Sequence, residues 1–364
     1  MDVQFASNSI GAMLNFQTFP FWLNIILFIL AGVTVWISGT RLTAYADIIS
    51  DRKNWDKASM GFIFLALATQ LPEIVTNTTG ALHGNGELVL NAMFGGMTMQ
   101  TAVLAIADIF IIGTTTLSFA ARKSINLLQG VVLILLLSLV LVATMLGDTV
   151  VFWHIGASPI LLAILYILAI FMFLDYGKNN GWSVVNFSED IKQKANPKDK
   201  RAKDSHTTKQ LYLFSGLASS AILIAGILLV QTAESIATQS GLGASFIGVT
   251  LLASSTSLPE LSASIAAVRL GAQSMAISNI FGSNLIMIFL LLPADMFYLN
   301  GAILNSVNDS AKFALVSGIV VTAIYVIGLI VRKSQTFLRM GMDSIAVLII
   351  YITTLYILYT LRGV

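Results

Sequence analysis

The chain has 364 residues, of which 56% are hydrophobic and only 10% are charged, with 20 basic and 18 acidic side chains. A soluble globular protein carries about 25% charged residues, so this composition excludes a water-soluble fold and predicts an all-α protein that crosses a membrane many times. The chain contains no cysteine, which excludes disulfides, iron-sulfur clusters and thiolate metal sites.

Ten apolar stretches follow one another along the chain, each long enough to cross a ~30 Å hydrocarbon layer as a helix. Residues 1–19 contain no Lys or Arg, so we expect the first stretch to be a permanent span rather than a signal peptide. The predicted spans are 20–42, 59–81, 87–113, 127–146, 154–175, 211–237, 244–268, 274–299, 312–332 and 341–361.

One long polar segment, 176–210, divides the chain into two groups of five spans, at 1–175 and 211–364. With ten spans, 18 of the 20 Lys and Arg residues fall on one side, and only Lys312 and Arg362 on the other. The positive-inside rule then predicts a cell or inner membrane protein with a cytoplasmic 176–210 loop and both termini outside. We interpret the loop as a solvated linker that fixes this topology, or as a segment that binds anionic lipid or a regulatory partner.

An internal repeat relates the two groups of spans. A single constant shift in residue number aligns the segment from Gly61 to Glu73 with that from Gly248 to Glu260, and the register holds from 61–110 to 248–297. Because each unit has an odd number of spans, the second copy enters the membrane from the opposite side, which predicts inverted-topology repeats. This architecture is typical of secondary transporters, in which the repeats exchange conformations to open alternately toward the two sides.

Acidic residues within predicted spans are candidate functional residues, because each costs on the order of 3 kcal/mol at mid-membrane. No Lys or Arg lies deep in any span to neutralise Glu73 or Glu260, so we expect their partner to be a mobile cation or a proton. Pro72 and Pro259 should break the second and seventh helices and free nearby backbone carbonyls. The five acidic residues within the predicted spans are Glu73, Asp108, Glu234, Glu260 and Asp295.

Polar side chains flank each glutamate at helical spacing. Such a set of oxygen ligands suits Ca²⁺, Na⁺ or Mg²⁺ and disfavours softer metals. In the alternative interpretation, the Ser and Thr residues only satisfy the broken backbone, and a protonated glutamate packs against a neighbour. The flanking residues are Thr69, Gln70 and Asn77 around Glu73, and Thr256, Ser257 and Ser264 around Glu260.

The sequences Thr-Gln-Leu-Pro-Glu73, Thr-Ser-Leu-Pro-Glu260 and Phe-Gly-Ser-Asn284 resemble the alpha-1 and alpha-2 repeats of the cation/calcium antiporter superfamily, which includes the sodium/calcium exchangers. The resemblance covers essentially the whole chain. It implies a cofactor-free antiporter that exchanges Ca²⁺ or a related cation against Na⁺ or H⁺. The ligands that it implies are the carbonyls of Ala66 and Ala253 with the side chains of Thr69, Glu73, Thr256, Ser257, Glu260 and Ser283.

Three features depart from that family pattern. Gln70 and Gly96 stand where the pattern has Ser, and Gln100 and Met287 stand where exchangers have Asn or Asp. Gln100 and Asn77 remain candidate ligands, but methionine does not bind a hard cation usefully. With two carboxylates where many sodium/calcium exchangers hold three, the alternatives are proton coupling, a different cation, or a non-transporting scaffold or sensor with the exchanger fold.

Asp108 and Asp295 are related by the repeat, and each lies about 12 Å along its helix from Gln100 or Met287. We interpret them as cation-capturing carboxylates in a vestibule at each mouth, or as interfacial carboxylates satisfied by water or a loop. Glu234 is a candidate for an external entry path. Since the sequence contains no phosphate-binding loop, nucleotide fingerprint or nucleophile triad, we expect no enzyme activity and no nucleotide or nucleic-acid partner. The expected partners are inorganic cations and the lipid bilayer.

Overall fold

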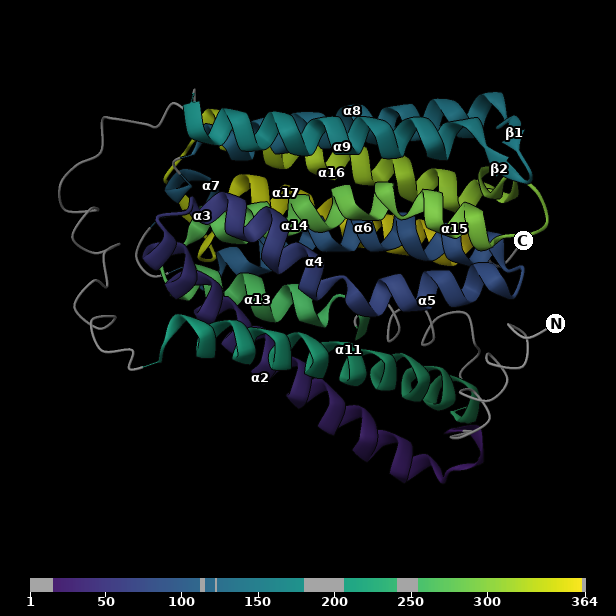
Figure 1. Ribbon diagram of the computed structural model, residues 1–364, viewed down its shortest axis with the longest axis horizontal. Helices are drawn as coiled ribbons and strands as arrows, with labels where there is room; N and C mark the ends of the chain where they lie inside the picture. Colours follow the sequence, from purple (N-terminus) through teal and green to yellow (C-terminus); the bar gives the residue numbers. More distant parts are fainter. Residues whose placement is uncertain (1–15, 112–114, 122, 180–205, 241–254, 362–364) are drawn as a thin grey trace.

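The computed structural model describes residues 16–111, 115–121, 123–179, 206–240 and 255–361 (Figure 1). Within these ranges, eight helices are long and apolar enough to cross a membrane, and a bent helix pair adds a ninth. The predicted span 244–268 lies partly outside the described residues, so the count of ten stays a prediction.

In the described part of the first half, the elements are helices and one short hairpin. Its elements are η1 (Phe16–Thr18), α2 (Phe21–Lys53), α3 (Lys57–Ser59), the π-helical segment η2 (Met60–Leu65), α4 (Ala66–Thr69), α5 (Leu71–Leu82), α6 (Gly86–Asp108), α7 (Leu117–Ala120), α8 (Ser124–Leu146), the antiparallel strands β1 (Val150–Phe152) and β2 (Ile155–Gly156), and α9 (Ala157–Asn179).

The described elements of the second half follow a similar order. It contains α11 (Thr208–Gln239), α13 (Leu258–Arg269), α14 (Gln273–Phe289), α15 (Leu291–Phe297), the 3-10 helix η4 (Ile303–Ser306), α16 (Asp309–Val331), the antiparallel strands β3 (Thr336–Phe337) and β4 (Met340–Gly341), and α17 (Met342–Leu361).

The repeat extends over nearly every element. Helices α2, α5 and α6 begin at positions 21, 71 and 86, and α11, α13 and α14 begin at positions 208, 258 and 273, all at one common offset. Helices α8 and α9 begin at positions 124 and 157, and α16 and α17 begin at positions 309 and 342, at a slightly smaller offset that is again common to both. The segment that leads to α16 is therefore slightly shorter than its counterpart before α8, and the helices on either side keep their spacing.

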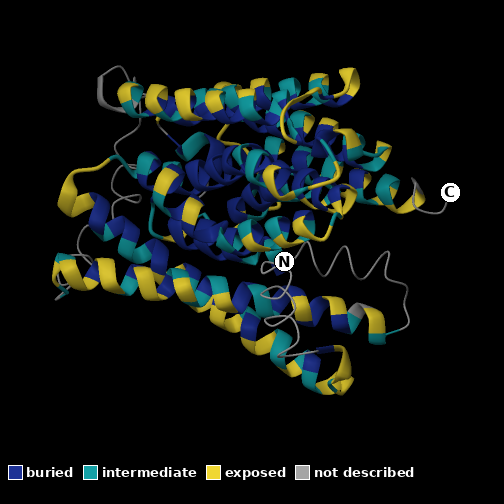
Figure 2. Cartoon of the chain, turned by 45° about the vertical axis from the view of Figure 1, so that its right-hand side comes forward, coloured by how far each residue is buried: buried dark blue, intermediate teal, exposed yellow. Residues whose placement is uncertain are grey.

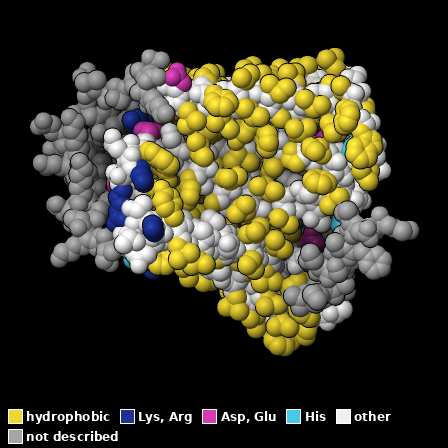
Figure 3. All heavy atoms as spheres, viewed as in Figure 1, with side chains coloured by type: hydrophobic (Ala, Val, Ile, Leu, Met, Phe, Trp, Pro, Cys, Tyr) yellow, Lys and Arg dark blue, Asp and Glu magenta, His cyan; other side chains and the backbone are white. Residues whose placement is uncertain are grey.

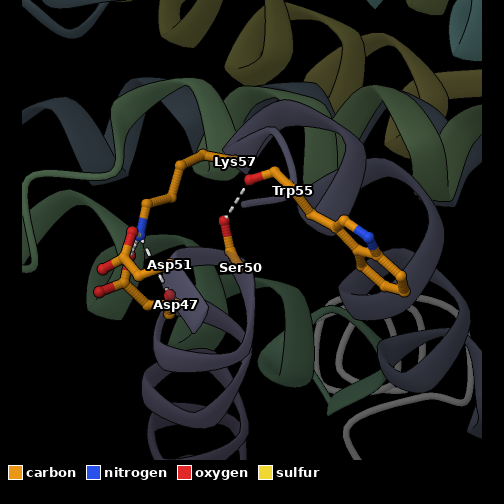
Figure 4. Close-up of polar contacts among 5 residues, drawn as sticks. All are labelled: Asp47, Ser50, Asp51, Trp55 and Lys57. Atoms are coloured by element: carbon orange, nitrogen blue, oxygen red, sulfur yellow. Dashed lines mark hydrogen bonds and ion pairs between the residues drawn. The ribbon is translucent and has the colours of Figure 1, made fainter. Parts of the chain in front are cut away.

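Helix α2 is longer than predicted, because it continues to Lys53 rather than ending near residue 42. The extension carries Asp47, which is buried, and Asp51, which lies one turn further on. The Lys57 ammonium contacts both carboxylates, at 2.7 Å from Asp51 Oδ1 (Figure 4). Asn54, in the left-handed conformation, then ends the helix.

One other boundary also differs from the prediction. The second strand of a β-hairpin occupies the start of the predicted span 154–175, so α9 begins only at Ala157. The predicted span 274–299 corresponds to the single span Gln273–Phe297, in which Leu290 separates α14 from α15. Pro293 in the first turn of α15 lacks the N–H that would continue the hydrogen bonding of α14.

The helices form a bundle with α14 at its centre. In the most apolar stretch of the span Gln273–Phe297, which α14 and α15 form together, 89% of the residues are buried, compared with 17% in the corresponding stretches of α2 and α17. Helices α2 and α11 lie side by side along one edge, and α8 and α9 along the opposite edge (Figures 1 and 2). A small cluster of Ala31, Val35, Ala225 and Leu229 joins α2 to α11, separate from the main core.

The surface of this bundle has the pattern expected for a protein surrounded by hydrocarbon. Figure 3 shows apolar side chains over most of the visible face, while Lys and Arg side chains gather at the end where α2 ends and α3 begins. The described helices therefore present an apolar band with a basic end.

Candidate functional site

The second predicted span is broken, as the sequence predicts. Helix α4 ends at Thr69, α5 begins at Leu71, and the two segments meet at 48°. Pro72 lies in the first turn of α5, where its missing N–H is tolerated. Pro259 has the same place in α13, which begins after Ser257. The residues at 241–254, which precede this second break, lie outside the described residues.

Glycines bring the central helix α14 against the broken helix. A Cβ at Gly282 would lie 2.7 Å from the carbonyl oxygen of Phe62, and a Cβ at Gly61 would overlap the carbonyl oxygen of Met275. No larger residue fits at either position without moving the backbone. This close approach packs α14 directly against η2 and α4 of the broken segment.

The two glutamates each lie in the first turn of the helix that follows a break. Glu260 is fully buried and Glu73 is 4% exposed. The two carboxylates are near enough to repel one another when ionised. Burying two ionised carboxylates together is unfavourable unless a cation or protons neutralise them.

The two carboxylates have different surroundings. Glu260 Oε1 accepts a hydrogen bond of 2.9 Å from the Gln70 amide nitrogen, and Thr69 and Ser283 lie beside the same carboxylate. Neither oxygen of Glu73 has a hydrogen-bond partner within the described residues. Glu73 is therefore the less satisfied of the two and the more available as a ligand.

Acceptor oxygens without partners gather on the helices around this pair. Buried polar atoms are normally paired, since leaving one unpaired costs about 1–3 kcal/mol. A bound cation or water satisfies several such oxygens at once. Within the described residues, these atoms are Gln70 Oε1, both Glu73 oxygens, Gln100 Oε1, Glu260 Oε2, Asn279 Oδ1, Ser283 Oγ and Asn284 Oδ1.

The described residues contain no group of three or more His, Asp or Glu side chains arranged to hold a metal ion. The arrangement instead offers two carboxylates together with neutral hydroxyl and amide oxygens. Such a set can neutralise one divalent ion and complete its coordination with hard oxygen ligands.

The Ala66 carbonyl is not freed by the helix break, contrary to the expectation from the sequence. It accepts hydrogen bonds from the Gln70 N–H at 3.1 Å and from the Thr69 hydroxyl at 3.3 Å. The physical reason is that helical backbone hydrogen bonding continues as far as Gln70, so the break lies after this carbonyl. Its predicted counterpart, Ala253, lies outside the described residues. In the second repeat Thr256 is half-buried and Ser257 is buried.

The other predicted ligands lie on both sides of the glutamates. The Asn77 amide nitrogen, one turn beyond Glu73, contacts Met287 Sδ at 3.9 Å. Gln100 is buried on α6 and its Oε1 has no partner in the described part of the chain. Their assignment as cation ligands stays a prediction.

Two amides on α14 were not predicted as ligands. Asn279 donates to the Ser264 hydroxyl at 3.4 Å, and Asn284 donates to the Thr101 hydroxyl at 3.2 Å. The carbonyl oxygens of both amides are free of partners within the described residues. The signal in the sequence that could have pointed to them is the presence of two asparagines in the largely apolar predicted span 274–299.

Asp108 binds loop backbone at the end of α6. Its Oδ1 accepts from the Leu117 N–H at 2.5 Å, and its Oδ2 accepts from the Gly341 N–H at 2.7 Å and the Ser344 hydroxyl at 2.8 Å. Gly341 and Ser344 belong to the second repeat, so this carboxylate joins the two repeats.

Asp295 makes the corresponding contacts at the other end. Its Oδ2 accepts from the Gly156 N–H in the first repeat at 2.7 Å, and its Oδ1 accepts from the Ile303 N–H at 2.6 Å. Both Asp108 and Asp295 are fully buried, so the vestibule interpretation does not describe this conformation. A carboxylate satisfied by a loop, the second interpretation, does. Glu234 is exposed on α11, and its place in an entry path stays a prediction.

Comparison with known proteins shows what this chain is similar to. A family model described as "Sodium/calcium exchanger protein" matches residues 23–174 and 211–360. The chain is 25% identical over 282 residues to the inner membrane protein YrbG of Escherichia coli (strain K12), which covers 74% of this chain and 78% of YrbG. It is 40% identical over 83 residues to the sodium/calcium exchanger MaX1 of Methanosarcina acetivorans, which covers 22% of this chain and 24% of MaX1.

The fold is similar to that of the sodium-calcium exchanger NCX_Mj, in a structure soaked with 10 mM Na⁺ and zero Ca²⁺. The TM-score is 0.66 at 20% identity, and the match covers 93% of this chain and 99% of the other. This likeness shows a shared multi-pass helical architecture.

Proposed function

Because the chain belongs to the sodium/calcium exchanger protein family, we propose that it is a secondary antiporter that exchanges Ca²⁺ or a related cation against Na⁺ or H⁺ by alternating access. As a family member it is a multi-pass membrane protein and an exchanger of cations. The transported cation, the coupling ion and the ligand residues belong to the proposal.

The observation that carries the proposal is the pair of buried glutamates, one from each repeat, in the first turns of α5 and α13. Together, the Glu73 and Glu260 carboxylates can neutralise one divalent ion, and the unpartnered oxygens around them can complete its coordination. Two ions that need the same carboxylates cannot occupy them together. Release of one ion is therefore required before the other binds, which is the condition for exchange.

The test is ion flux in proteoliposomes that contain the purified full-length protein. We expect that Glu260→Gln abolishes uptake of ⁴⁵Ca²⁺ into loaded vesicles, because it removes one of the two negative charges. The matched control is Glu87→Gln, since Glu87 is exposed at the start of α6 and should leave uptake unchanged. Wild-type rates in Glu260→Gln would exclude the proposed site.

The coupling ion is tested in the same vesicles by imposing Na⁺, K⁺ and H⁺ gradients one at a time. A third carboxylate at position 287 would favour binding of more cations, but the chain has Met287 there. The absence of that carboxylate favours coupling to protons over coupling to Na⁺. Uptake driven by a pH gradient alone supports proton coupling, whereas uptake driven only by Na⁺ supports sodium coupling. Stabilisation by cations without any flux would indicate a scaffold or sensor that retains the fold.

We also propose that the 176–210 loop is cytoplasmic and that both termini are outside. The gathering of Lys and Arg side chains at one end of the described bundle supports this orientation (Figure 3).

A further inference from the structure

The two repeats differ in the residues that they contribute to the site. The shift that aligns the repeats pairs Gln70 with Ser257, and Gly96 with Ser283. The second repeat therefore supplies two hydroxyl oxygens where the first supplies an amide and no side chain. A site built by inverted repeats is in this respect chemically asymmetric.

The Gln70 amide donates a hydrogen bond to one carboxylate oxygen of Glu260. Both side chains are fully buried, and the Gln70 amide nitrogen lies 2.9 Å from Glu260 Oε1. An ionised carboxylate only accepts hydrogen bonds, so the amide has to present its NH₂ group. A donor therefore lies against the carboxylate oxygen where a cation would bind, and the amide's own Oε1 has no partner within the described residues.

On the side of Glu73, an apolar group takes the space of a ligand. A Cβ at Gly96 would lie 3.2 Å from the methyl carbon of Met287, and the Met287 sulfur contacts the Asn77 amide. The Met287 thioether thus fills the space beside Gly96, and a thioether is a poor ligand for a hard cation. No hydroxyl or carboxylate from position 96 or 287 is available to hold a second, monovalent ion.

We propose that Gln70 is a specificity-determining residue that selects a single divalent cation over monovalent cations. Its amide holds Glu260 while no cation is bound, and an incoming ion has to displace it. A divalent ion between Glu73 and Glu260 is attracted about twice as strongly as a monovalent ion at the same place, so it displaces the amide where Na⁺ does not. Once displaced, the amide can turn its unpartnered Oε1 toward the ion. This inference rests on the proposed function of the site.

The test measures thermal unfolding of the purified full-length protein in detergent, because a ligand that binds only the native state raises the unfolding temperature. Ca²⁺ and Na⁺ are titrated separately, with choline chloride as the control for ionic strength. We expect Ca²⁺ to stabilise the wild type and Na⁺ to act no more strongly than choline. In Gln70→Ser, the apparent affinity for Na⁺ should rise at least about tenfold, since a hydrogen bond to a charged group no longer has to be broken.

The matched control is Gln129→Ser, a buried glutamine on α8 that accepts a hydrogen bond from Ser278 outside the site. This variant should respond to Ca²⁺ and Na⁺ as the wild type does, relative to its own baseline. If Gln70→Ser does not fold, Gln70→Asn is used, because its side chain keeps an amide but is one methylene shorter, which should weaken the hydrogen bond to Glu260.

The outcomes separate the two proposals. If Ca²⁺ stabilises the wild type but Na⁺ does so equally well, or if the Gln70 variants do not gain a response to Na⁺, the role of Gln70 is wrong and the exchanger proposal stands. If Ca²⁺ does not stabilise the wild type, the assignment of Ca²⁺ as the transported cation and the role of Gln70 both fail.

Discussion

Gly95 and Gly96 are neighbours on α6 with different surroundings. A Cβ at Gly96 would lie 3.2 Å from the Met287 methyl carbon, whereas a Cβ at Gly95 meets nothing within 4 Å. Replacing either glycine by serine gains the same intrinsic helix propensity. The difference in stability between the two serine variants therefore reports the contact with Met287.

We therefore expect Gly96→Ser to be less stable than Gly95→Ser by about 1 kcal/mol, the lower end of the cost of overpacking a core. The measurement is the thermal unfolding temperature of each variant in detergent. In a Met287→Ala background the difference between Gly96→Ser and Gly95→Ser should largely vanish, because the methyl group that is crowded has been deleted from both variants. Equal stabilities for the two serine variants would show that Met287 does not fill this space.

Single residues of the site could be predicted where chemistry alone singles them out. Glu73 and Glu260 are charges in apolar spans, and the proline before each one marks a break. The hydrogen bond between Gln70 and Glu260 could not be predicted, because it joins residues that are 190 positions apart and depends on how two breaks meet in space. The pairing of the Ala66 carbonyl likewise depends on where helical hydrogen bonding ends, which a proline position fixes only to within a turn.

At the scale of elements, the ends of α6 and α15 are held by buried carboxylates. Asp108 accepts three hydrogen bonds, from Leu117, Gly341 and Ser344. An asparagine there would place an NH₂ group against at least one backbone N–H. We expect Asp108→Asn to cost about 2 kcal/mol of stability, since hydrogen bonds to a charged acceptor are lost and a donor is left unpaired.

Thermal unfolding checks this prediction, with Asp309→Asn as the control, because the Asp309 side chain is 97% exposed and should contribute little. An Asp108→Asn protein with wild-type stability but slower flux would instead support a role in cation capture.

Element positions were more predictable than element ends. Apolar length locates α6, α8 and α16 well, since hydrocarbon thickness sets their extent. The end of α2 was misplaced because its last turns are polar; the contacts of Lys57 with Asp47 and Asp51 stabilise these turns, and the left-handed Asn54 ends the helix. The two hairpins are too short to leave a period in the sequence, and their register depends on the turn and on Asp108 and Asp295.

At the scale of the whole molecule, α2 and α11 form a pair at one edge of the bundle (Figure 2). Alternating access requires one part of the protein to move against another, and the boundary between this pair and the central helices is the candidate for that movement. At this boundary, a Cβ at Gly39 on α2 would lie 3.2 Å from Ser262 Cβ on α13. This is close to the roughly 3.5–4.5 Å found in disulfides.

Since the chain has no cysteine, the pair Gly39→Cys and Ser262→Cys gives one defined cross-link. We expect oxidation to stop cation exchange in proteoliposomes and reduction to restore it, with each single cysteine variant insensitive to oxidant. Undiminished exchange in the fully cross-linked protein would show that the two parts do not move apart at this point.

The contacts of Asp108 and Asp295 also bear on how the protein is made. Each carboxylate binds a backbone N–H of the opposite repeat, Gly341 or Gly156. During synthesis the first repeat emerges before the second. Asp108 Oδ1 can then already accept from the Leu117 N–H, but Asp108 Oδ2 and the Gly156 N–H lack their partners until the second repeat is in place. The two repeats therefore complete each other's polar contacts only after the second has entered the membrane.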